Sequence, residues 1–192
     1  MNDKEKDTVT KEERSLLETL DKIVRSEKVR AQILPIVERV RTELARKPNT
    51  VMAWEPIALE TFGDLPSAIR SGWLFILRAG SDTGAERHPN SHQRMMTFGG
   101  TGDMQTDIKS VKNEVESQSE IEWQSNVLVS DADAPLEARW ISIPQNIWHR
   151  PVIPKAADWV LVSFHTVPAT ELIEERPGAK QMRYLGTESK GR

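Results

Sequence analysis

The hydrophobic pattern changes at Pro48, and this change constrains the fold more than any other feature of the sequence. Before Pro48, apolar residues recur at helical spacing. After it, short apolar runs alternate with Gly, Pro, Asn and Asp, and no helical pattern is interleaved between them. Parallel βαβ units need such interleaved helices, so we do not expect them. We therefore expect a mainly β chain, an antiparallel sandwich or barrel, with an N-terminal helical extension.

Residues 1–48 are predicted to form a helical arm. Thr10 and Glu13 have the spacing of a capping box at a helix start. Pro35 interrupts a second helical stretch, where it either kinks that stretch or occupies the first turn of a new helix. One apolar stripe runs along the arm and consists of Leu16, Leu17, Leu20, Ile23, Val24, Ile36, Val37, Val40 and Leu44. A single stripe means one buried face, so we expect the arm to pack on the main domain or on a partner subunit.

Residues 49–177 are predicted to form the β domain. Five runs rich in Ile, Val, Trp and Phe have the length of strands, namely 72–77, 94–98, 121–129, 136–143 and 159–164. The polar stretch 101–119 is expected to be a loop or a poorly formed strand pair. Residues 178–192 are expected to be a polar tail.

Composition excludes several classes of function. The chain of 192 residues has 26 Lys and Arg against 29 Asp and Glu, so it lacks the charge that attracts nucleic acid or an anionic membrane. It contains no Cys, which excludes disulfides, thiolate metal sites and Cys nucleophiles. Residues 1–7 lack an apolar signal-peptide core, and no apolar run reaches the roughly 18 residues that span a bilayer. We expect a soluble, cytoplasmic protein.

Histidines and a glutamate cluster in one short region. Of the four His residues, His88 and His92 lie close together, and His149 and His165 follow later. Glu86 and His88 are two residues apart, so they project to the same side of an extended segment. A turn over residues 89–91 would bring His92 back to face them. One carboxylate and two imidazoles are a suitable beginning for a divalent metal site.

These residues resemble the two sequence motifs of the cupin superfamily. Gly80, Glu86, His88, His92 and Gly99 reproduce the spacing of the first motif. Residues 144–149 resemble the second motif, P-x-G-x-x-H, with Asn at the glycine position. Asn tolerates the left-handed turn conformation that Gly usually supplies there. The resemblance covers about residues 70–165 and implies a cupin-like antiparallel jelly roll.

The resemblance also implies a set of metal ligands. Position by position, they are Glu86, His88, His92 and His149, with Glu86 where His is usual and His92 where Glu is usual. The set retains three nitrogen donors and one carboxylate, which suit Fe(II), Mn(II), Ni(II), Cu(II) or Zn(II). We expect one divalent ion, with Fe(II) favoured because cupins with this donor set include dioxygenases. Cupins without metal also exist, so a metal-free binding barrel is the alternative.

Two further residues are candidates for catalysis. If His92 points inward, strand alternation sends Arg94 inward, where its guanidinium would pair with a substrate carboxylate. In the alternative, Arg94 is exposed and pairs with surface acids. A bulge after Pro89 would produce this arrangement, because it would exchange the inward-facing and outward-facing positions of the strand. Met96, Phe98 and Trp148 are either a wall of this cavity or plain core. His165 is either a buried barrel histidine or a group that reaches the substrate.

The leading hypothesis for function is a metal-dependent cupin enzyme that acts on a small, carboxylate-bearing organic molecule. The resemblance favours a non-haem metal oxygenase of dioxygenase type, and a lyase or isomerase fits the same residues. The alternative is a non-catalytic metal- or ligand-sensing cupin that binds a protein partner through the helical arm. The resemblance also implies a homodimer. No nucleic-acid or membrane partner is expected.

Overall fold

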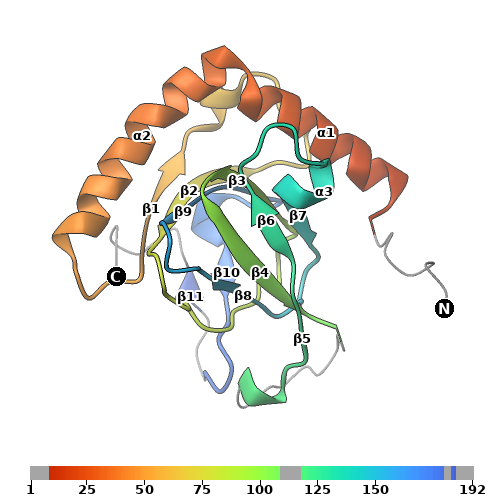
Figure 1. Ribbon diagram of the computed structural model, residues 1–192. Helices are drawn as coiled ribbons and strands as arrows, with labels where there is room; N and C mark the ends of the chain where they lie inside the picture. Colours follow the sequence, from red (N-terminus) through yellow and green to blue (C-terminus); the bar gives the residue numbers. More distant parts are fainter. Residues whose placement is uncertain (1–8, 109–117, 180–182, 185–192) are drawn as a thin grey trace.

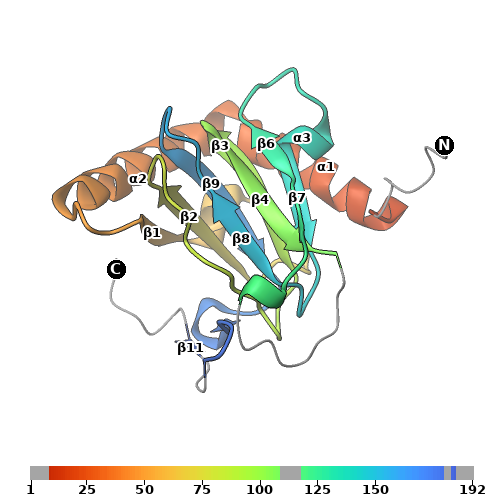
Figure 2. The same ribbon diagram turned by 60° about the horizontal axis from the view of Figure 1, so that its bottom comes forward.

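The computed structural model describes residues 9–108, 118–179 and 183–184. In these residues two antiparallel sheets face each other, and two N-terminal helices lie along the outer face of one sheet (Figures 1 and 2). The fold is mainly β, as the change of pattern at Pro48 predicts. Within the described ranges, neither helix combines the length and the apolar character that crossing a membrane requires.

The arm consists of α1 (Lys11–Arg25) and α2 (Glu27–Arg46). Thr10 caps α1 as predicted, because its hydroxyl accepts a hydrogen bond from the Glu13 N–H at 3.2 Å. Ser26 both ends α1 and caps α2. Pro35 therefore lies inside α2, and the alternative that it begins a new helix is wrong.

The apolar stripe of the arm is buried against the chain's own sheet. Its members share one hydrophobic cluster with outward-facing side chains of the strands. Asp21 of α1 strengthens this contact by pairing with the buried guanidinium of Arg139 and by accepting a hydrogen bond from Trp140 Nε1 at 2.8 Å. Of the two expected packing partners for the arm, the structure shows the main domain.

The sheet beneath the arm has the strand order β1-β2-β9-β3-β7. Its strands are β1 (Met52–Ile57), β2 (Ser71–Leu77), β3 (Gln93–Gly99), β7 (Trp140–Ile143) and β9 (Trp159–His165). Every residue of β9 is buried, because the arm covers one face of this sheet and the second sheet covers the other. This double burial explains the continuous apolar run that the sequence shows there.

The facing sheet is built around β4 (Thr101–Asp107). It also contains β5 (Trp123–Gln124), β6 (Val127–Val129) and β8 (His149–Val152). Of the two alternatives for 101–119, a loop is wrong for 101–107, which form the well-paired strand β4 rather than a poorly formed one, and residues 109–117 lie outside the described residues. Gly102 allows the sheets to approach closely, since a Cβ there would lie 2.0 Å from the Trp159 ring.

Two of the predicted strands are divided in the structure. The run 121–129 contains β5 and β6, separated by Ser125 and Asn126, and the side-chain amide of Asn126 donates to the Met104 carbonyl at 2.9 Å. The run 136–143 begins with the short helix α3 (Leu136–Arg139) before β7. Pro135 immediately precedes α3, a position where proline suits a helix start.

The C-terminal segment returns along the barrel opening. It includes β10 (Ile173–Glu174), which pairs with β11 (Arg183–Tyr184), and most of the predicted tail 178–192 lies outside the described residues. Three short 3-10 helices complete the elements of the described ranges: η1 (Leu59–Phe62), η2 (Gln118–Glu120) and η3 (Ala169–Glu171).

Candidate metal centre

Three of the four predicted ligands meet in the space between the sheets. Glu86 and His88 lie on the extended segment before β3, and His149 is the first residue of β8. Glu86 and His149 form an antiparallel bridge in which each backbone N–H donates to the other residue's carbonyl oxygen at 2.8 Å. This bridge aligns the two motif segments, so side chains 63 positions apart in sequence become neighbours.

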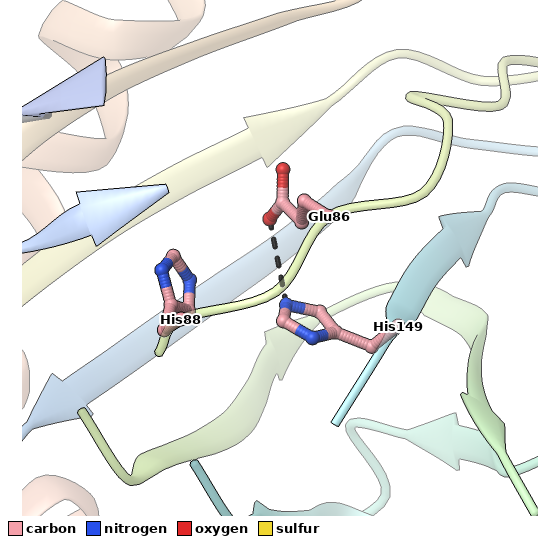
Figure 3. A group of neighbouring side chains, drawn as sticks. All are labelled: Glu86, His88 and His149. Carbon is pink, nitrogen blue, oxygen red and sulfur yellow. Dashed lines mark ion pairs between the residues drawn. The ribbon is translucent and has the colours of Figure 1, made fainter. Parts of the chain in front are cut away.

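The donor atoms of these side chains converge (Figure 3). One ligand atom from each of Glu86, His88 and His149 lies within 4.8 Å of the other two. His149 Nε2 is 3.5 Å from Glu86 Oε1, and the two imidazole ring centroids are 5.4 Å apart. Both histidines are almost fully buried. The spacing leaves room for an ion between the three groups.

Backbone carbonyls fix the tautomer of both imidazoles. His88 Nδ1 donates to the Ile173 carbonyl at 2.8 Å, and His149 Nδ1 donates to the Ile147 carbonyl at 3.1 Å. Each ring therefore presents a lone pair on Nε2, the arrangement that protein carbonyls commonly impose on metal-ligating histidines. His149 Nε2 is buried and has no hydrogen-bond partner. A buried nitrogen in this condition fits a metal ligand.

The electrostatics also favour the metal-binding forms. Burial raises the pKa of Glu86, but the nearby His149 ring and the charge of Arg176 outweigh burial and lower that pKa to about 2. Arg176 Nη2 donates to Glu86 Oε2 at 2.7 Å. Burial and the proximity of His149 lower the pKa of His88 to about 4. At neutral pH the carboxylate is thus ionised and His88 is neutral, as metal binding requires.

His92 does not join this group, contrary to the expected four-ligand set. Its Nε2 hydrogen bonds Ser142 Oγ at 2.6 Å and lies 3.7 Å from Glu13 Oε1 of the arm. The turn before it is held by His92 N–H, which donates to Thr166 Oγ1 at 3.0 Å. This turn directs the His92 side chain toward the arm rather than into the barrel.

Arg94 also faces the arm, so the phase of β3 is opposite to the one that an inward His92 would give. Arg94 Nε and Nη2 each donate to a carboxylate oxygen of Glu13 at 2.7 Å. The alternative in which Arg94 pairs with an acid is therefore the one observed, although the pair is largely buried. Met96 and Phe98 pack into the cluster beneath the arm, and Trp148 lies in a separate cluster with Ile121.

The metal group lines a cavity that opens to solvent. Most of its wall is apolar and includes Met52, Trp54, Phe75, Met95, Met104 and Leu161. His165 also lines it, with its ring 5.1 Å from that of His88. Burial and the neighbouring histidines hold the pKa of His165 well below its ordinary value.

Two residues of the site were not identified from the sequence. Arg176 reaches Glu86 from the C-terminal segment, 90 positions away, and nothing in the local sequence marks this contact. Gln93 lines the cavity because β3 has the reversed phase. The contact between the His92 N–H and Thr166 Oγ1 joins residues distant in sequence. Alternation along β3 alone therefore did not predict which of its side chains face the cavity.

Comparisons with known proteins add a general likeness. No family model matches, and no curated protein matches. Similar solved structures include a sugar phosphate isomerase from a cupin superfamily of Silicibacter pomeroyi, 14% identical with a TM-score of 0.43, covering 67% of this chain and 68% of that one. They also include an oxalate decarboxylase–formate complex from Lactobacillus farciminis, 10% identical with a TM-score of 0.46, covering 66% and 31%.

A third similar structure is the capsular polysaccharide assembling protein CapF of Staphylococcus aureus. It is 12% identical with a TM-score of 0.43, and the match covers 58% of this chain and 27% of CapF. This chain thus matches about a quarter of the CapF length.

The architecture of this chain agrees with the jelly roll that the sequence motifs predict. Its two facing antiparallel sheets have the arrangement that the motifs imply, and both motif segments line the space between them. Asn146 adopts a φ of 66°, the left-handed conformation expected at the glycine position of the second motif. The metal set differs from the expected one, because it contains two histidines and one carboxylate.

Proposed function

We propose that this chain is a non-haem metal oxygenase that binds one divalent ion, preferably Fe(II), through Glu86, His88 and His149. One observation carries the proposal: two imidazoles with fixed tautomers and one carboxylate converge within 4.8 Å at an apolar cavity. Two histidines and one carboxylate with open positions are typical of non-haem Fe(II) oxygenases. The displacement of His92 therefore supports this class.

Each residue of the centre has a distinct task. His88 and His149 present Nε2 because their Nδ1 atoms are occupied by carbonyls. Arg176 occupies Glu86 Oε2, which leaves Oε1 on the side of His149. When bound, the ion would supply Lewis acidity and a place for small oxygen ligands. Because the cavity wall is mainly apolar, few polar side chains near the ion would compete with these oxygen ligands.

The cavity favours a neutral, largely apolar substrate. Among the described residues, its lining contains no Lys or Arg. Arg94, on which the expectation of a carboxylate-bearing substrate rests, is committed to Glu13 on the other face of the sheet. A substrate carboxylate would thus find no Lys or Arg in the wall, whereas a small apolar molecule would bury its surface against Met and aromatic side chains.

The sensing alternative finds less support in the arm. The apolar stripe of α1 and α2 is buried against the sheet, so a partner that binds this stripe would have to displace the arm from the sheet. Exposed faces of the helices are mainly charged. The enzyme hypothesis needs no such rearrangement.

Oxygen uptake tests the proposal. Protein loaded with Fe(II) under anaerobic conditions is mixed with oxygenated buffer and a panel of neutral aromatic and aliphatic compounds. We expect substrate-dependent O2 consumption that falls more than about 100-fold in His149→Ala and persists in the matched control His92→Ala. Turnover without O2 consumption would instead indicate a lyase or isomerase and overturn the oxygenase assignment. Equal activity in His149→Ala would overturn the metal centre.

A further inference from the structure

Among the described residues, two polar atoms of the cavity wall outside the metal group are buried without a hydrogen-bond partner, Thr83 Oγ1 and Gln93 Oε1, and the second lies on β3 beside His165. Gln93 is only 4% exposed and lines the cavity. Its Oε1 is buried and accepts no hydrogen bond. An unpaired carbonyl oxygen in an apolar environment is costly, so such atoms are rare in folded proteins unless a ligand completes them.

A chain of buried side chains holds the Gln93 amide in place. Gln93 Nε2 donates to Ser163 Oγ at 3.2 Å, and Ser163 Oγ is 3.2 Å from His165 Nε2. His165 Nδ1 is in turn 3.2 Å from Ser91 Oγ. This hydrogen bond occupies the Ser163 side of the Gln93 amide and leaves the other end of the amide without a protein partner. Ser163 and His165 are both fully buried.

The same series of hydrogen-bonded side chains connects Gln93 to the metal centre. Gln93 and His165 are register partners on β3 and β9, and the His165 ring contacts that of His88 at 5.1 Å. The unpaired oxygen therefore belongs to the wall that continues from the metal ligands. It offers an acceptor on the β3 side of the cavity, while Thr83 Oγ1 is an unpaired polar atom elsewhere in the wall.

We propose that Gln93 Oε1 selects the substrate, and that this substrate is an apolar molecule with one hydroxyl or N–H group. This inference deepens the proposed function and depends on it for its catalytic meaning. The hydroxyl or N–H group of the substrate would donate a hydrogen bond to Gln93 Oε1, while the apolar part of the substrate would lie between the Met and aromatic side chains. Gln93 would thus orient the substrate relative to Glu86, His88 and His149.

A pair of probes with the same shape tests this selection. Benzyl alcohol and ethylbenzene differ by one hydroxyl in place of a methyl group. Their binding to the full chain is measured by protein NMR titration after removal of metal with a chelator, so that the hydroxyl cannot bind an ion. We expect the wild type to prefer benzyl alcohol by about tenfold or more. Gln93→Met should lose this preference and retain ethylbenzene binding.

Two further variants complete the design. Gln105→Met is the matched control, because Gln105 is a strand glutamine that binds Asp103 and Arg150 and does not line the cavity. It should retain the preference. Ser163→Ala removes the hydrogen bond that holds the amide, so it should weaken the preference; it also serves as the test if Gln93→Met fails to fold.

The outcomes separate this inference from the proposed function. Equal affinity for both probes, no saturable binding of either, or an unchanged preference in a folded Gln93→Met would overturn the role of Gln93. Metal content is measured on the same variants before chelation. Normal metal retention without a probe preference overturns only this inference, whereas a clear preference in a protein that never retains metal overturns only the metalloenzyme.

Discussion

The backbone N–H of Asn146 donates to the carbonyl oxygen of His88 at 3.1 Å. The turn of the second motif is thereby attached to the extended segment of the first, in addition to the Glu86–His149 bridge. His88 and His149 are thus positioned relative to each other by backbone contacts. Asn146 is the non-glycine residue with a positive φ in the described part of the chain.

The left-handed turn at Asn146 predicts an ordered effect of substitution. Asn146→Gly should unfold in urea at a midpoint close to that of the wild type, because Gly adopts this φ without strain. Asn146→Ala should lose about 1–2 kcal/mol, since a Cβ is unfavourable there and the Asn side chain no longer compensates. Equal stability of the Gly and Ala variants would show that the turn relaxes to another conformation.

The buried pair between Asp21 and Arg139 predicts a large loss of stability. Asp21→Ala leaves the Arg139 guanidinium, whose side chain is 7% exposed, without its charged partner in α1. The expected loss is about 3–5 kcal/mol in the free energy of unfolding by urea. Glu38→Ala is the control: its pair with Arg41 is exposed, so it should cost less than about 1 kcal/mol. A small effect at Asp21 would indicate that the arm is only weakly attached.

Attachment of the arm should also depend on pH in the acid range. Burial opposes ionisation of Asp21 and Glu13, but hydrogen bonds from Arg139 and Arg94 prevail and lower both pKa values below their ordinary 3.8 and 4.5. Groups with a depressed pKa stabilise the fold above their unfolded pKa, and this stability is lost as pH falls through the folded pKa.

Urea midpoints measured from about pH 6 to about pH 3 should therefore fall over the whole range, first because the pKa values of His88, His92 and His165 are depressed, and more steeply below about pH 4.5, where Asp21 and Glu13 also titrate. The variant Glu13→Gln cannot titrate at this position, so its curve should start lower and fall less steeply. A midpoint that rises on acidification in the wild type would contradict the assignment of these two carboxylates.

Local patterns predicted much of the fold. Helical spacing and the Thr10 cap are short-range features, and they placed the arm and its start. The strands β2 and β9 were predicted because double burial produces continuous apolar runs. The strand β4 was missed, since its Gly102 and polar residues look like a loop. Only the closeness of the Trp159 ring, a contact distant in sequence, explains why glycine is needed there.

The metal centre was predicted only in part, because motif spacing is local whereas other contacts of the site are distant in sequence. Glu86, His88 and His149 belong to motif spacings that the sequence displays. The orientation of His92 and Arg94 depends on Glu13, which lies about 80 positions earlier and reaches them only after α1 packs on the sheet. Alternation along one strand cannot reveal this contact. Arg176 and Gln93 were missed because long-range pairing determines both.

Metal content of the protein purified without an affinity tag tests the central claim most directly. We predict about one divalent ion per chain in the wild type and in His92→Ala, and a loss of that ion in both His88→Ala and His149→Ala. The measurement is elemental analysis after incubation with Fe(II), Mn(II), Ni(II) or Zn(II) and removal of the excess. No retained ion in the wild type, or loss in His92→Ala equal to that in His149→Ala, would contradict a centre formed by Glu86, His88 and His149.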